Sequence, residues 1–166
     1  IYPCEYVVVD PVMISKSGYS LLRTEAKENL IKYLIPKAYI VTPNVPEAEE
    51  ISSIKIETVE DMKKAGQIIL NLGPKYVLMK GGHLNGDCVD ILIGKDLFEV
   101  FEGERIDRKN THGTGCTISS AITSHLALGY DIKEAVRLSK EYITEAIRHS
   151  FDIGKGVGPV HHFYKF

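Results

Sequence analysis

A glycine-rich segment, His112-Gly113-Thr114-Gly115-Cys116, is the part of the sequence best suited to chemistry. The residues after it are typical of the first turns of a helix. Glycines let backbone N–H groups turn toward one point, and a helix start adds a partial positive charge. The segment therefore predicts an anion site suited to phosphate. The same field favours the thiolate form of Cys116, which makes this cysteine a candidate for a chemical role.

Several known motifs do not account for this segment. The sequence contains no Gly-Lys-Ser or Gly-Lys-Thr, so the segment is not a Walker A loop, and the third glycine of a dinucleotide fingerprint is absent. A cysteine hydrolase would pair Cys116 with His112, but no third residue that would orient the histidine is evident. The structural alternative is a glycine turn that leads into a helix, with Cys116 packed beneath it as a small apolar side chain.

Polar side chains follow three apolar runs that are typical of buried strands. Ligands of α/β sheets bind beyond the carboxyl ends of the strands, so we expect these side chains to meet there. Asp10 and Glu47 are the carboxylates expected to hold Mg²⁺, which prefers oxygen ligands and keeps several waters. Lys80 is expected to place its charge against a transferring phosphoryl group, and Asn44 is expected to hydrogen-bond a phosphate or a metal-bound water. The structural alternatives are a turn aspartate, a helix-start acid and a solvated lysine; His83, His161 and His162 are expected to be surface or satisfied histidines.

Strands and helices alternate along the chain, which predicts an α/β fold with parallel crossovers and a mostly parallel sheet. Thr24 is the expected N-cap of the first helix, and Thr58 is the expected N-cap of the third. We expect strands over 5–9, 38–41 and 75–79, a hairpin over 88–94 and 97–102, and helices over 24–34, 46–51, 59–71, 114–128 and 132–149.

The composition narrows the class of function. The chain has 166 residues, of which 44% are hydrophobic and 25% charged, and its formal net charge is −2. This charge gives no electrostatic reason to bind nucleic acid or an anionic membrane, and no apolar run reaches the roughly 20 residues of a membrane helix. Its cysteines, Cys4, Cys88 and Cys116, form no CxxC pair, so neither a disulfide framework nor a structural zinc site is expected. This cysteine usage predicts a protein of the reducing cytoplasm.

The first residues indicate that a part of the domain precedes this sequence. The chain starts at Ile1 and runs almost at once into Tyr6-Val7-Val8-Val9, a β-branched run typical of a strand buried on both faces. Such a strand needs neighbours on both sides, so it rarely opens a complete domain. We therefore expect residues 1–166 to form one domain that is the C-terminal part of a longer one.

The order of these segments resembles the ribokinase-like superfamily, specifically its hydroxymethylpyrimidine kinase branch of thiamine biosynthesis. Asn44 and Glu47 fit the N-x-x-E motif of the superfamily. Val157 and His161 depart from the branch pattern in the tail. The resemblance rests on Asp10-Pro-Val-Met13 with Lys16-Ser-Gly18, Thr42-Pro-Asn-Val-Pro-Glu-Ala-Glu49, Met79-Lys-Gly-Gly-His83, Asn110-Thr-His-Gly-Thr-Gly-Cys116 and Gly156-Val-Gly-Pro-Val-His-His-Phe163.

The resemblance implies a three-layer α/β/α fold and a role for each candidate residue. Cys116 would be the catalytic base that accepts a proton from a substrate hydroxymethyl group as it attacks the γ-phosphorus of ATP. The N–H groups of residues 113–115 would stabilise the transferring phosphoryl group. Asp10 and Glu47 would organise Mg²⁺. Asn44 and Lys80 would contact the phosphates of ATP. Residues 100–111 and the tail after 150 would cradle the adenosine.

The substrate implied by the resemblance is hydroxymethylpyrimidine, its monophosphate, or both in sequence. A pyridoxal or pyridoxine kinase is the alternative enzyme, because the same branch phosphorylates such alcohols and most of the substrate pocket lies in the N-terminal part of family members. A noncatalytic nucleotide-binding fragment is the alternative from another class. The resemblance also implies a homodimer as an assembly state, since family members commonly dimerise.

Overall fold

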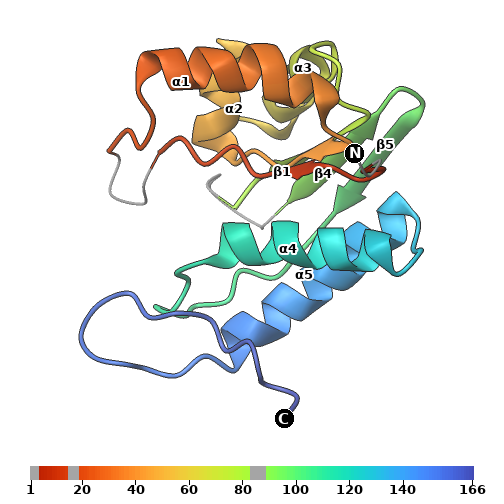
Figure 1. Cartoon of the computed structure of the whole chain (residues 1–166). Helices are drawn as coiled ribbons and strands as arrows, with labels where there is room; N and C mark the ends of the chain where they lie inside the picture. Colours follow the sequence, from red (N-terminus) through yellow and green to blue (C-terminus); the bar gives the residue numbers. More distant parts are fainter. Residues whose placement is uncertain (1–3, 15–18, 83–88) are drawn as a thin grey trace. The chain divides into compact units, whose positions relative to one another are not determined.

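The computed structural model describes residues 4–14, 19–82 and 89–166 (Figure 1). The chain divides into two units, Ile1–Glu104 and Arg105–Phe166. The first unit contains a sheet with its helices, and the second contains two long helices and the tail. Four residues singled out in the sequence lie outside the described residues, namely Lys16, Gly18, His83 and Cys88.

Five strands form one sheet in the order β1-β2-β3-β4-β5. The strands β1, β2 and β3 are parallel neighbours, and β4 is antiparallel to both β3 and β5. Strand β5 therefore runs in the same direction as the first three, which confirms the mostly parallel sheet of an α/β fold. Their bounds are Val8–Val9 for β1, Ile40–Val41 for β2, Tyr76–Lys80 for β3, Asp90–Gly94 for β4 and Leu97–Phe101 for β5.

Three helices of the first unit lie on one side of its sheet: α1 (Thr24–Asn29), α2 (Val45–Ser52) and α3 (Val59–Leu70) (Figure 1). Helix α3 buries Met62, Ala65, Gly66 and Ile69, whose spacing of three and four residues places them on one face. A Cβ atom on Gly66 would stand only 2.3 Å from Ile93 Cδ1 on β4. The missing side chain thus lets α3 approach the sheet closely.

The first helix begins one residue earlier than its capping pattern indicates. Arg23 is the N-cap, because its carbonyl accepts the N–H groups of Ala26 and Lys27, and no side chain caps the helix. The prediction that Thr24 is the N-cap is therefore wrong. The expected span of 24–34 is helical throughout, but residues Leu30–Leu34 form a π-helical turn. A 3-10 turn, Ile35–Lys37, follows it.

The second unit is built on α4 (Thr114–Ala127) and α5 (Ile132–Arg148), which pack against each other. Asp131 caps α5, since its carboxylate accepts the Glu134 N–H at 3.0 Å. The tail after α5 returns to the segment before α4, where Pro159 and His112 form an isolated parallel bridge. Within the described ranges, no helix combines the length and the apolar character that crossing a membrane requires.

Candidate functional site

Polar residues at the carboxyl ends of β1, β2 and β3 form a group that we call the strand-end cluster: Asp10, Thr42, Asn44, Glu47 and Lys80. Lys80 Nζ lies 3.0 Å from Asp10 Oδ1, and both side chains are only 14% exposed. Thr42 Oγ1 donates to the same carboxylate oxygen at 3.3 Å. Asn44 and Lys80 form an isolated parallel bridge. The meeting of these strand ends, predicted from sequence, is therefore present in the fold.

Glu47 joins the cluster through the start of α2. The Asn44 side chain accepts the Glu47 N–H at 3.0 Å, and the Glu47 carboxylate accepts the Asn44 N–H at 2.9 Å, which makes a capping box. Glu47 is 2% exposed, and this burial raises its pKa above the usual value. The hydrogen bond from Asn44 and the charge of Lys80 oppose that rise in pKa, while the charge of Asp10 adds to it. The structural role of Glu47 as a helix-start acid is thus confirmed.

The donor chemistry of the cluster fits Mg²⁺. Within the described residues, both contacts of Asp10 fall on Oδ1, so Oδ2 is available to an ion. The Glu47 carboxylate already accepts backbone N–H groups of Asn44 and Met13, so it would reach an ion through a bound water more easily than directly. The described ranges hold no group of three or more His, Cys, Asp or Glu side chains placed around one point. A donor set with few carboxylates suits an ion that keeps its waters.

The glycine turn, residues 112–116, leads directly into α4. Gly113 is the N-cap and adopts a φ of +83°, a conformation that favours glycine. Two side-chain hydroxyl groups stabilise the turn by hydrogen bonds to its backbone. Thr114 Oγ1 donates to Thr111 O at 3.1 Å, and Thr117 Oγ1 donates to Gly113 O at 2.7 Å. The first N–H groups of an α-helix have no intrahelical acceptor. The first N–H groups of α4 are therefore without intrahelical acceptors, and that they form an anion hole stays a prediction.

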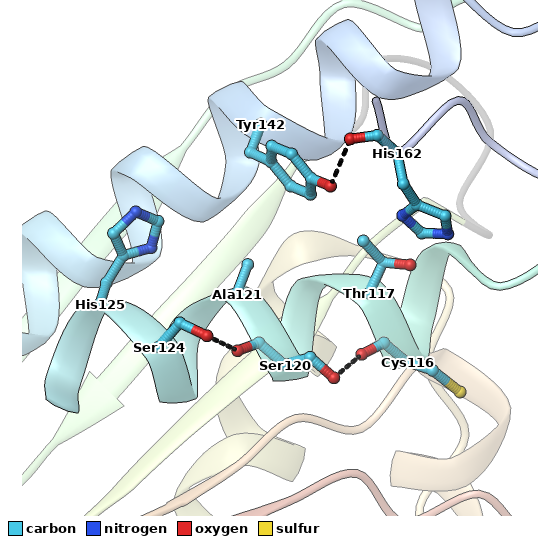
Figure 2. A pocket seen from close by; sticks show the side chains of 8 residues that line it. All are labelled: Cys116, Thr117, Ser120, Ala121, Ser124, His125, Tyr142 and His162. Atoms are coloured by element: carbon cyan, nitrogen blue, oxygen red, sulfur yellow. Dashed lines mark hydrogen bonds between the residues drawn. The ribbon is translucent and has the colours of Figure 1, made fainter. Parts of the chain in front are cut away.

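Cys116 is exposed and lies on the wall of a cavity of about 440 Å³ in the second unit. An exposed thiol contradicts the alternative in which Cys116 packs beneath the turn. Figure 2 shows the sulphur pointing away from Tyr142 and His162, which lie across α4 from it. No hydrogen bond joins Cys116 Sγ to His112 in the part of the chain that the structure describes, so the hydrolase alternative gains no support. The cavity is lined by Cys116, Thr117, Ser120, Ala121, Ser124, His125, Tyr142 and His162.

The hydroxyl groups around this cavity donate their protons to the protein itself. Ser120 and Ser124 donate to backbone carbonyls one turn earlier, and Tyr142 Oη donates to His162 O at 3.1 Å. Ser139 Oγ donates to Ala135 O, so the proton in its contact with His125 must come from His125 Nδ1. The polar wall therefore presents mainly hydrogen-bond acceptors to a ligand.

The two groups of candidate residues belong to different units. Asp10, Asn44, Glu47 and Lys80 come together in the first unit, and residues 113–116 come together in the second. That both groups act in one site stays a prediction. Thr42 was not singled out from sequence as a site residue, although its place between a buried strand and Pro43 is a signal that could have identified it.

Comparison with known proteins gives consistent similarities. A family model described as phosphomethylpyrimidine kinase matches residues 2–161. A hydroxymethylpyrimidine/phosphomethylpyrimidine kinase of Staphylococcus aureus (strain MRSA252) is 47% identical over 159 residues, which cover 94% of this chain and 58% of that relative. A crystal structure of phosphomethylpyrimidine kinase from Clostridium difficile 630 is 69% identical with a TM-score of 0.75, and the match covers 86% of this chain and 57% of that one.

A pyridoxal kinase from Staphylococcus aureus in complex with AMP-PCP and pyridoxal is also similar. It is 38% identical with a TM-score of 0.88, and the match covers 96% of this chain and 58% of that one. The ribokinase-like fold class expected from sequence is thus confirmed. The chain spans 58% of the length of the Staphylococcus aureus pyrimidine kinase that it matches.

Proposed function

The chain belongs to the phosphomethylpyrimidine kinase family, and from that premise we propose that it supplies the phosphoryl-transfer apparatus of a kinase for 4-amino-5-hydroxymethyl-2-methylpyrimidine, its monophosphate, or both. The observation that carries the proposal is the strand-end cluster, where Lys80 and the carboxylates of Asp10 and Glu47 gather at one edge of the sheet. Positive charge and carboxylate oxygens at such an edge suit a nucleotide phosphate with its metal ion.

Cys116 would act as the base. Its thiolate would accept the proton of the hydroxymethyl group while that oxygen forms a bond to the γ-phosphorus of ATP. The bond from the γ-phosphorus to the bridging oxygen breaks, and ADP leaves. The N–H groups of Gly113, Thr114 and Gly115 would stabilise the charge on the transferring group, which is the main source of catalysis in this chemistry. The exposed position of Cys116 at the start of α4 supports this role.

Lys80 and Asn44 would bind the phosphates of ATP. The ion pair with Asp10 holds the Lys80 ammonium group at the strand end, where it would face the nucleotide. Asn44 uses Oδ1 to cap α2, so its Nδ2 group remains as a donor for a phosphate oxygen. Asp10 and Glu47 would hold Mg²⁺, which neutralises phosphate charge when bound.

A pyridoxal kinase is the second candidate, since a solved enzyme of that name superposes with a TM-score of 0.88. The identity is 38% to that kinase and 69% to the phosphomethylpyrimidine kinase of Clostridium difficile, and the higher identity favours the pyrimidine substrate. The third candidate is a fragment that binds nucleotide without catalysis, because the chain spans only part of the length of its relatives.

An ADP-release assay with three alcohols separates these candidates. The alcohols are hydroxymethylpyrimidine, its monophosphate and pyridoxine. The assay would use the chain itself and a version extended to the length of its Staphylococcus aureus relative, which we call the extended kinase. We expect the extended kinase to release ADP in a reaction that depends on a pyrimidine alcohol. Release with pyridoxine alone would establish the second candidate in its place, and ATP binding without release on any alcohol would leave only nucleotide binding.

A further inference from the structure

Asn110 is a buried polar residue two positions before the glycine turn. It is 3% exposed, and its amide makes two hydrogen bonds. Asn110 Oδ1 accepts the Gly158 N–H at 2.9 Å, and Asn110 Nδ2 donates to Asp152 Oδ1 at 2.8 Å. These partners stand 48 and 42 residues further along, in the tail after α5. One side chain thus joins the segment before α4 to the tail.

The two partners need an amide at this position. Gly158 N–H is a donor and the Asp152 carboxylate is an acceptor, so only one orientation of the Asn110 amide satisfies both. Leucine has a similar size but could make neither bond. Aspartate could accept from Gly158 but would set a second carboxylate against Asp152.

The tail meets the glycine turn at the same point. The Gly158 carbonyl accepts the His112 N–H at 3.0 Å, so Gly158 is bonded both to Asn110 and to the turn. A Cβ atom on Gly158 would stand 2.3 Å from Asn110 Oδ1, which leaves no space for a larger residue. Lys109 Nζ donates to Lys155 O at 2.6 Å and ties the two segments once more.

We propose that Asn110 is a positioning residue that sets the direction of the N–H groups at Gly113, Thr114 and Gly115. The connection runs from Asn110 through Gly158 to the His112 backbone, and the Thr114 hydroxyl ties the turn to the Thr111 carbonyl. This inference rests on the proposed function, because the direction of these N–H groups matters for catalysis only if they bind a transferring phosphoryl group.

Such a role has a distinct kinetic signature. The N–H groups of an anion hole act mainly on charge that develops in the transition state, so their displacement lowers kcat more than it raises KM. Asn110 itself is buried and does not touch the reacting atoms in the proposed mechanism. A residue that only supported folding would lower the melting temperature and the active fraction, while kcat per folded molecule would stay unchanged.

The test compares three variants in the extended kinase: Asn110→Asp, Asp152→Asn and the double variant. We expect Asn110→Asp to lower kcat by about 100-fold, with a small change in KM for ATP. Asp152→Asn alone should have a small effect, because its amide oxygen still accepts from Asn110. The double variant should regain most of kcat, because the amide introduced at position 152 can donate to the carboxylate introduced at position 110.

A glycine variant tests the other end of this contact. Gly158→Ala should reproduce the loss of kcat, because its Cβ collides with Asn110. Amide hydrogen exchange over residues 111–116 gives a readout that needs no activity. We expect faster exchange there in Asn110→Asp and slower exchange again in the double variant.

The outcomes separate the two proposals. Unchanged kcat and unchanged exchange in Asn110→Asp would overturn the role of Asn110, and so would a double variant as impaired as the single one. If the unmutated protein transfers no phosphoryl group, the proposed function fails by itself. The exchange pattern would then still decide whether Asn110 orders the turn.

Discussion

The carboxylate of Glu47 has two roles, one in the fold and one in the candidate site. It completes the capping box of α2 and lies in the strand-end cluster beside Lys80 and Asp10. Burial raises its pKa, which disfavours the charged form that Mg²⁺ would bind. A bound cation would offset this cost, so ion binding and the ionisation of Glu47 should support each other.

The variant Glu47→Gln should change how stability depends on pH. Because the folded pKa lies above the unfolded value of 4.5, the folded protein binds more protons than the unfolded chain between these values. The free energy of unfolding should therefore fall as pH rises through this window. Glutamine also completes a capping box, so the variant should lose this fall and keep its helix start. Urea unfolding of the variant and the unmutated protein from pH 4 to pH 8 measures this pH dependence of the free energy of unfolding.

Glu49 on the same helix provides the control of opposite sign. The Ile56 N–H donates to its carboxylate at 2.8 Å and lowers its pKa. Glu49 therefore contributes stability above its unfolded pKa, and this stability is lost as pH falls through the folded pKa. Glu49→Gln should cost stability near neutral pH and little in acid. The same pH slope in both variants would contradict this assignment of charges.

Helix α3 contains a buried and an exposed isoleucine side by side. Ile69 is 0% exposed and faces the core, whereas its neighbour Ile68 is 38% exposed. We expect Ile69→Ala to lower the free energy of unfolding by about 2–5 kcal/mol, because it leaves a cavity in the core. Ile68→Ala should lower it by less than about 1 kcal/mol. Denaturant unfolding of the two variants checks the orientation of α3, and equal losses would contradict it.

Local capping signals predicted one helix start correctly and another wrongly. The Thr58 side chain caps α3 as expected, with Asp61 N donating to Thr58 Oγ1 at 3.2 Å. At Thr24 the same signal failed, because the carbonyl of Arg23 begins the helical hydrogen bonding. The π-helical turn at Leu30–Leu34 and the order of the strands depend on packing between distant segments. No local signal contains that information.

In the candidate site, too, the sequence did not predict contacts between distant segments. Asp10, Asn44 and Lys80 could be placed together because the carboxyl ends of parallel strands share one edge of a sheet. The contact of Asn110 with Asp152 could not be predicted, since 42 residues separate them and neither belongs to a helix or strand. An asparagine before a glycine turn is locally indistinguishable from any other polar loop residue.

At the scale of the whole molecule, the proposed reaction needs both units. The first unit holds the side chains assigned to Mg²⁺ and to the phosphates, and the second holds the turn and the base. Neither group could transfer a phosphoryl group alone, because charge neutralisation and proton removal must act on the same substrate. That Cys116 acts on a substrate bound at both groups stays a prediction of the proposed function.

The most direct test of the role of Cys116 is the kcat of pyrimidine-dependent ADP release by Cys116→Ala, measured in the extended kinase. We predict a fall of about 100-fold or more, as expected when a general base is removed, with an unchanged melting temperature because the side chain is exposed. Cys4→Ala, which removes the other exposed cysteine among the described residues, should keep the full rate. A Cys116→Ala protein with the kcat of the unmutated kinase would contradict the account.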